Sequence, residues 1–244
     1  MSLVAERLRA VEARIYSAAV RAGRDPASVR LVAVTKTVPV EFVMEAVGAG
    51  AKILGENRVQ EALSKKLTLD SLKAARYEAG PPASEAGLPA PEWHLIGPLQ
   101  KNKARQAVGE FGLIHSLDSL ELAREIDRQA KKKGIVQEAL LEINIASEET
   151  KHGIRPEEAP GFMKEASGLE NLNITGLMCV PPAVDDPEKS RPYFKELNCL
   201  AAELALKGFD MTELSMGMSQ DFEVAVEEGA TLVRVGTAIF GARA

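Results

Sequence analysis

A lysine stands at the end of an apolar, strand-like run near the start of the chain. In the segment LVAVTKTVP, residues 31–39, Lys36 comes directly after this run, and Pro39 stands at the end of the segment. A lysine is seldom buried unless it is paired or reactive. Desolvation lowers its pKa, and the neutral amine is then a nucleophile that forms Schiff bases with carbonyl compounds. A lysine whose charged head stays in solvent is the alternative that this segment leaves open.

A second group of candidate residues lies near the end of the chain. Gly236 and Thr237 follow the run LVRV, and Ser219 follows the run TELSM across a flexible Gly217. The loops after the last two strands of a (β/α)8 barrel commonly bind phosphate through backbone N–H groups and the start of a short helix. Ser219 suits either a helix N-cap or a phosphate oxygen. Together with Lys36 on the first strand, these residues indicate a phosphorylated carbonyl compound as the ligand.

The elements that must position these residues alternate between short β-rich runs and helical patterns. Eight runs are apolar at nearly every residue, as in parallel strands that are covered on both faces. They end near Thr35, Gly55, Gly97, Leu117, Ile145, Val180, Met216 and Gly236. Eight strand–helix units in 244 residues predict an α/β fold, a single (β/α)8 TIM barrel spanning residues 1–244. A doubly wound sheet is the alternative, but VTKTVP lacks the glycine-rich turn of a dinucleotide-binding site.

Two segments stand outside this alternation. Val4, Leu8, Val11 and Ile15 have the spacing of one helix face, which predicts an extra N-terminal helix packed on the core. Residues 71–92 are rich in Pro, Gly, Ala and Ser, which predicts a loop or a flexible insertion. Because this insertion joins a helix to the following strand, we expect it at the bottom of the barrel, away from the chemistry.

The charge, the cysteine content and the apolar runs of the chain exclude several classes of partner and location. The formal charge of −5 and the absence of a Lys/Arg-rich run argue against nucleic acid and an anionic membrane, and favour a small ligand. Two cysteines are too few for a disulfide framework. The charged start of the chain lacks an apolar signal core, and no apolar run approaches the roughly 20 residues of a membrane span. We therefore expect a cytoplasmic protein and, by default, a monomer.

The sequence resembles the pyridoxal phosphate (PLP) homeostasis proteins, a barrel family related to the N-terminal domain of alanine racemases. The resemblance rests on AVTKT, GENRVQE, WHLIGPLQKNK, SLD, INIASEETKHG, GLMCVPP, SMGMSQDF and VRVGTAIFGAR, in this order over nearly the whole chain. It implies PLP as the cofactor and Lys36 as its Schiff-base residue. It also implies that Ser219, Gly236 and Thr237 contact the phosphate.

Comparison with the racemases gives Arg234 the place of the arginine that faces the pyridine nitrogen, with phosphate binding as its alternative role. A guanidinium accepts no proton, so the nitrogen would stay unprotonated and PLP would be a weak electron sink. The racemases take a second base, a tyrosine, from an additional domain, whereas Tyr16, Tyr77 and Tyr193 fall on none of the predicted strand-to-helix loops. Val180 stands where racemases carry a histidine.

These features favour a carrier without strong turnover, which takes part in intracellular PLP (vitamin B6) and amino-acid homeostasis. Candidate partners are PLP-dependent apo-enzymes and free amino acids. A PLP-dependent amino-acid racemase is the first alternative. A Schiff-base aldolase acting on a sugar phosphate is the second, and it would carry no chromophore.

The remaining polar candidates each have a plain structural interpretation. Asn57 either hydrogen-bonds the cofactor, which we favour, or orders its own loop. Lys151 lies where racemases have an arginine near the cofactor, and an exposed loop lysine is the alternative. His94, His115 and His152 lack the short spacing of metal ligands, so we expect no metal site, and we expect His94 to be a hydrogen-bonded strand residue.

Overall fold

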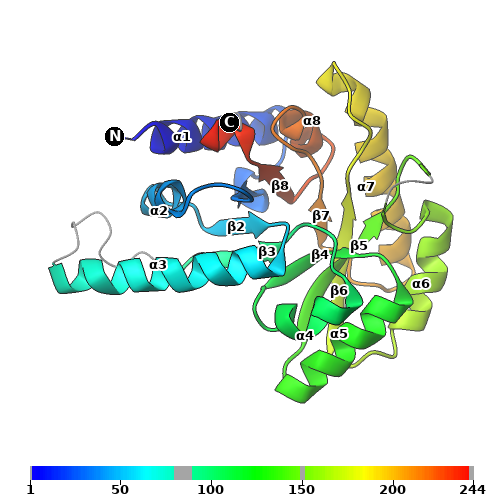
Figure 1. Cartoon of the computed structure of the whole chain (residues 1–244). Helices are drawn as coiled ribbons and strands as arrows, with labels where there is room; N and C mark the ends of the chain where they lie inside the picture. Colours follow the sequence, from blue (N-terminus) through cyan, green and yellow to red (C-terminus); the bar gives the residue numbers. More distant parts are fainter. Residues whose placement is uncertain (1, 80–89, 149–151, 242–244) are drawn as a thin grey trace.

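Eight parallel strands close into a barrel in the order in which they occur along the chain (Figure 1). The computed structural model describes residues 2–79, 90–148 and 152–241. The strands are β1 (Arg30–Val34), β2 (Ile53–Glu56), β3 (Glu92–Leu95), β4 (Leu113–Leu117), β5 (Gln137–Ile143), β6 (Leu172–Cys179), β7 (Glu213–Ser215) and β8 (Leu232–Val235). The predicted α/β TIM barrel is confirmed, and each strand ends within two residues of its predicted end.

The strands divide their side chains between the barrel interior and the surrounding helices. Alternate residues point to opposite faces of a strand, and the buried side chains form two separate clusters. The smaller cluster fills the barrel with one residue from each of six strands: Val32, Ile53, Leu113, Leu140, Met178 and Leu232. Their neighbours, such as Ala33 and Val233, belong to the larger cluster between barrel and helices. These strands are apolar throughout because both of their faces are covered.

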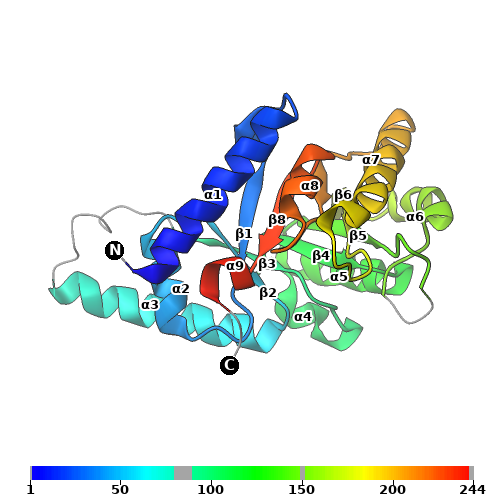
Figure 2. The same cartoon turned by 90° about the horizontal axis from the view of Figure 1, so that it is seen from above.

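The helices connect successive strands and form the outer layer of the barrel (Figures 1 and 2). They are α1 (Leu3–Arg21), α2 (Val40–Gly48), α3 (Val59–Ala79), α4 (Ala104–Ala107), α5 (Leu120–Lys133), α6 (Ala159–Ala166), α7 (Arg191–Leu206), α8 (Phe222–Glu227) and α9 (Thr237–Phe240). Single 3-10 turns lie at Pro26–Ser28, Lys101–Lys103, Pro156–Glu158 and Pro187–Ser190. Among the described residues, no helix has the length and apolar character needed to cross a membrane.

The first helix is the predicted addition to the eight repeated units. Ser2 caps α1 by accepting a hydrogen bond from the backbone N–H of Ala5, and the predicted face of Val4, Leu8, Val11 and Ile15 is buried. This face packs against α2, α8 and α9, so α1 lies beside the first and last strands (Figure 2). The extra N-terminal helix is therefore confirmed.

The prediction for residues 71–92 is wrong at both ends of the segment. Residues 71–79 continue α3, which projects beyond the barrel in both views (Figures 1 and 2). Glu92 already belongs to β3. The alanines and charged residues of SLKAARYEA are good helix formers, and the composition of the Pro- and Gly-rich second half masked this signal. Residues 80–89 of the predicted insertion lie outside the described part of the chain.

We expect the connection between α3 and β3 to be dispensable for ligand binding. It leads into the N-terminal end of β3, whereas barrels bind ligands at the C-terminal ends of their strands. Replacing residues 80–89 by a Gly/Ser segment of equal length should change the PLP dissociation constant by no more than about twofold, measured by fluorescence titration. A large loss of affinity in a folded variant would show that this connection reaches the ligand.

Candidate functional site

The C-terminal ends of β1 and β8 bring the two ends of the chain together. The strands pair in parallel with Ala33 opposite Val235, which puts Gly236 beside Val34, two residues before Lys36. The approach is close, because a Cβ atom on Gly236 would lie 3.3 Å from the Cβ atom of Val34. The half-buried Lys36 and the predicted phosphate residues after β8 thus occupy neighbouring strand ends.

The loop that carries Lys36 is fixed on both sides by α3. Lys65 Nζ donates to the carbonyl oxygen of Thr35 at 2.6 Å, and Glu61 Oε1 accepts the backbone N–H of Thr37 at 2.6 Å. Thr37 has a φ of 60°, a left-handed conformation that a β-branched residue rarely adopts. The two bonds hold the backbone immediately before and after Lys36, so they offset the cost of this conformation.

A buried carboxylate completes this clamp, which we define as Glu56, Glu61 and Lys65. Glu56 is fully buried, and its Oε1 accepts from Lys65 Nζ at 2.7 Å and from Thr35 Oγ1 at 2.7 Å. Burial raises the pKa of Glu56, and the hydrogen bonds from Lys65 and Thr35 only partly counteract it. The clamp is not among the predicted residues, although Glu56 inside an apolar strand and the i, i+4 pair of Glu61 and Lys65 are signals in the sequence.

Ser219 lies against the residues that follow β8. Its Oγ accepts the backbone N–H of Gly236 at 3.2 Å and that of Ala238 at 3.4 Å. The N-cap of α8 is Asp221, so the capping role considered for Ser219 on that helix is wrong, and its hydroxyl instead serves the first turn of α9. Thr237, the first residue of α9, is exposed. The hydroxyl of Ser219 and the N–H groups of this turn therefore converge.

Arg234 projects from β8 into the barrel. It is buried, with Nη1 donating to Ser215 Oγ and Nη2 donating to the carbonyl oxygen of Cys179 at 2.8 Å. Burial lowers its pKa from the usual value, while Cys179, Glu142 and Asp221 act in the opposite direction. Cys179 packs in the core, and burial raises the pKa of its thiol to about 12. The guanidinium is thus held at the upper end of the barrel interior.

The other predicted candidates lie around the same rim or remain apart from it. Asn57 is half-buried directly after β2, and the close approach of Gly97 to its backbone leaves no room for a Cβ atom, which would lie 2.6 Å from the Asn57 carbonyl oxygen. Lys151 lies outside the described residues. His94 is a hydrogen-bonded strand residue, as predicted, with Nδ1 at 2.9 Å from His115 Nε2.

Glu142 is a carboxyl group that the sequence analysis did not select. It lies on β5, partly exposed, and burial together with the nearby charge of Asp118 raises its pKa to about 7. His152 and Arg234 partly counteract this shift, and His152 Nδ1 lies 3.5 Å from Asp118 Oδ2. A charged residue within the apolar run ALLEINI was the available signal. Near neutral pH this carboxyl group can therefore both give and take a proton.

The raised pKa of Glu142 predicts a pH-dependent contribution to stability. The folded chain holds this proton more tightly than the unfolded chain, so stability is highest below pH 4.5 and falls as the pH rises towards about 7. The free energy of urea unfolding of the wild type, minus that of Glu142→Gln, should fall by about 2 to 3 kcal/mol between pH 4.5 and 8. A difference that stays constant over this pH range would refute the shift.

Comparisons with known proteins show the family of this chain. Residues 7–244 match the family described as "Alanine racemase, N-terminal domain". The "Pyridoxal phosphate homeostasis protein" of Aquifex aeolicus is 44% identical over 239 residues, which cover 98% of this chain and 97% of that protein. The chain belongs to this family. The resemblance to the PLP homeostasis proteins, inferred from the sequence motifs, is thereby confirmed.

Two solved structures extend the comparison. PipY of Synechococcus elongatus, solved with PLP bound, is 37% identical and superposes with a TM-score of 0.79, covering 98% of this chain and 100% of PipY. An alanine racemase of Clostridium difficile is 14% identical with a TM-score of 0.68, covering 98% of this chain and 56% of the racemase. The racemase likeness shows the shared fold alone. The roles of Lys36, Asn57, Ser219, Arg234, Gly236 and Thr237 stay predictions.

Proposed function

We propose that this protein binds PLP and takes part in intracellular PLP and amino-acid homeostasis. In this proposal Lys36 holds the cofactor as a Schiff base, without strong turnover. The observation that carries it is the adjacency of Lys36, on a loop clamped by α3, to the turn of hydrogen-bond donors after β8. The PLP-bound structure of PipY, a relative matched over 98% of this chain, supports the choice of ligand.

The donor set after β8 fits a phosphate group. A phosphate carries about −1.5 to −2 charges at neutral pH and accepts several hydrogen bonds. Ser219 Oγ already lies where the N–H groups of Gly236 and Ala238 converge, and Thr237 offers an exposed hydroxyl. A phosphate oxygen can take over these backbone donors while the Ser219 hydroxyl turns to donate to it. The absence of a side chain on Gly236 lets this turn lie close to Val34 of β1.

Arg234 favours holding the cofactor over using it. PLP when bound supplies an electron sink, which is strongest when its ring nitrogen is protonated. In our proposal Arg234 faces this nitrogen, to which a guanidinium can donate but from which it accepts no proton. Its orientation is set by Ser215 and the Cys179 carbonyl, and these two bonds leave further N–H donors for a ligand. Phosphate binding stays the alternative role of Arg234.

A PLP-dependent amino-acid racemase is the second candidate, and Glu142 is the observation that favours it. Its pKa of about 7 and its electrostatic interaction with Arg234 suit a group that moves a proton near the cofactor. Tyr16 lies on α1 and Tyr193 on α7, so neither belongs to a strand-to-helix loop. A weak racemase-like activity would therefore depend on Glu142.

The wider setting follows from the same proposal. Candidate partners are PLP-dependent apo-enzymes that receive the cofactor and free amino acids that compete with Lys36 for it. We propose a monomer in the cytoplasm, where PLP-dependent enzymes of amino-acid metabolism need a supply of cofactor.

One loading experiment with two readouts tests the proposal. The purified chain mixed with PLP should absorb near about 420 nm, and borohydride should remove this band and leave a stable adduct on Lys36. In heavy water, the loaded protein should exchange the α-proton of L-alanine more slowly than about once per second. It should also transfer PLP to an apo-enzyme whose activity depends on the cofactor.

The outcomes separate the candidates. Absence of the absorption band would refute the Schiff base with PLP and leave the Schiff-base aldolase. Exchange at about one per second or faster, with inversion of configuration and loss of exchange in Glu142→Gln, would establish the racemase. Slow exchange together with transfer of PLP supports the carrier.

A further inference from the structure

A continuous series of hydrogen bonds crosses the barrel from its bottom to Arg234. Glu92 Oε1 lies 3.0 Å from His94 Nε2, His94 Nδ1 lies 2.9 Å from His115 Nε2, and His115 Nδ1 lies 2.9 Å from Ser215 Oγ. Arg234 Nη1 donates to the same Ser215 oxygen. We call Glu92, His94, His115, Ser215 and Arg234 the buried chain. It links side chains from β3, β4, β7 and β8.

The middle of the buried chain has no access to solvent. His94, His115 and Ser215 are all 0% exposed. Barrel interiors are usually filled by Val, Ile and Leu, as they are in the smaller cluster of this protein. Polar groups at such depth stabilise the fold only when every member is hydrogen-bonded, because an unpaired one costs its full desolvation. The unbroken series meets this requirement.

Both ring nitrogens of each histidine have a partner, so the direction of the bonds follows from the tautomers. Burial lowers the pKa of His115 well below its usual range, so its ring is neutral and has one donor. In the arrangement that ends on the Glu92 carboxylate, His94 Nε2 donates to Glu92 and His115 Nε2 donates to His94 Nδ1. Ser215 Oγ then donates to His115 Nδ1 while it accepts from Arg234. In this arrangement all bonds point from the arginine to the carboxylate.

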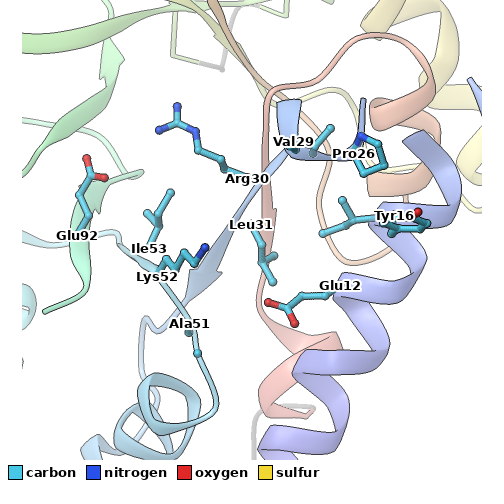
Figure 3. Close-up of a pocket in the computed structure, with 13 residues that line it drawn as sticks. Glu12, Tyr16, Pro26, Val29, Arg30, Leu31, Ala51, Lys52, Ile53 and Glu92 are labelled. Carbon is cyan, nitrogen blue, oxygen red and sulfur yellow. The ribbon is translucent and has the colours of Figure 1, made fainter. Parts of the chain in front are cut away.

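The two ends of the buried chain lie on opposite faces of the barrel. Arg234 is near the C-terminal end of β8, next to the proposed cofactor site. The side chain of Glu92 is 47% exposed at the bottom, at the rim of a cavity of about 510 Å³ between α1 and the starts of β1–β3. Figure 3 shows Glu92 and Glu12 on opposite sides of this cavity, with Lys52 between them.

We propose that His94, His115 and Ser215 are positioning residues for Arg234, and that they fix its guanidinium against the cofactor through a hydrogen-bonded chain anchored at Glu92. The role towards the cofactor rests on the proposed PLP binding. The fixed guanidinium itself does not, because Ser215 and the Cys179 carbonyl already hold two of its nitrogens. A carboxylate on the bottom face thereby influences the group beside the cofactor ring.

The ligand-free protein tests the buried chain by itself. In ¹⁵N NMR spectra at pH 7, the His115 ring should be neutral and protonated at Nε2. Arg234 should give separate Nη signals, because its bonds restrict rotation. In Ser215→Ala these signals should merge, and in Ser215→Thr, which keeps the hydroxyl, they should stay separate. A His115 ring that is protonated at Nδ1 or charged, or separate Arg234 signals in Ser215→Ala, would overturn the proposal.

The PLP-loaded protein tests whether the buried chain affects the bound cofactor. With ¹⁵N-labelled PLP, Ser215→Ala should raise the dissociation constant about tenfold or more and move the ring-nitrogen signal, and Ser215→Thr should restore both. Glu92→Gln should move the same signal less, and Glu12→Gln, a change on the other side of the same cavity, should leave it in place. Unchanged PLP spectra and affinity in Ser215→Ala would refute the positioning role.

The two sets of measurements separate this inference from the proposed function. If the wild type binds no PLP, the proposed function fails, while the Nη signals of Arg234 still decide whether the buried chain fixes the guanidinium. If PLP binds to the wild type, and the Ser215 and Glu92 variants give the same affinity and spectra as the wild type, the proposed function stands and the positioning role fails.

Discussion

Replacing Lys36 by alanine should abolish the covalent attachment of PLP and leave the barrel folded. The side chain is half-buried at the end of β1 and contributes little to the core, whereas it supplies the amine in our proposal. The band near about 420 nm and the borohydride-stable adduct should both disappear. Absorption spectra and mass spectrometry of the reduced protein measure these losses, and circular dichroism checks the fold.

Two further variants show whether the attachment of PLP needs the amine of Lys36 or only a positive charge. Lys36→Arg keeps the positive charge but offers no amine of suitable pKa, so it should lose the adduct as completely as alanine does. Lys52→Ala removes an exposed lysine at the bottom of the barrel and should keep the adduct. A reducible adduct that persists in Lys36→Ala would assign the attachment to another lysine.

Replacing Lys65 by methionine should destabilise the protein by about 3 to 5 kcal/mol, because it leaves the buried Glu56 carboxylate without its partner. The change also removes the bond to the Thr35 carbonyl, so the loop that carries Lys36 loses one of its two fixed points. Urea unfolding measures the stability. We expect the rate at which Lys36 reacts with PLP to fall as well, since the loop is no longer held.

The neighbouring lysine provides a matched control for this variant. Lys66 pairs with Glu110 at 3.3 Å in a more exposed position, so Lys66→Met should cost about 1 kcal/mol or less. Changing Glu56 to Gln together with Lys65→Met should recover a large part of the loss, because the unpaired charge is removed. An equal loss in both single variants, or no recovery in the double variant, would contradict our account of the clamp.

The sequence by itself determined the barrel and the location of the predicted site. Apolar runs alternate with helical patterns, and each run ends within two residues of the observed strand end. Such patterns are local, because a buried strand or an amphipathic helix is written into consecutive residues. Once a barrel is inferred, its closure makes the first and last strands neighbours. The adjacency of Lys36 and Gly236 therefore followed before any coordinates were known.

Local sequence predicts the structure less well where one segment combines two different signals. Residues 71–79 were assigned to a flexible insertion because the segment as a whole is rich in Pro, Gly and Ser, yet they extend α3. Ser219 was considered as a cap for the next helix, but its hydroxyl bonds to N–H groups seventeen and nineteen positions away in the chain. The hydroxyl therefore serves α9, which is distant in sequence, and not the next helix along the chain.

Only the tertiary structure decided which polar residues act together. The clamp joins Glu56, Glu61 and Lys65 to the backbone around Lys36, and the buried chain joins residues from four strands between positions 92 and 234. Apart from the i, i+4 pair of Glu61 and Lys65, spacing along the chain carries no trace of these pairings, because hydrogen bonds depend on distances of about 3 Å that strand register and rotamers set. A barrel turns distant residues into neighbours. For this reason the sequence could indicate the cofactor site, and the structure had to supply what holds it in place.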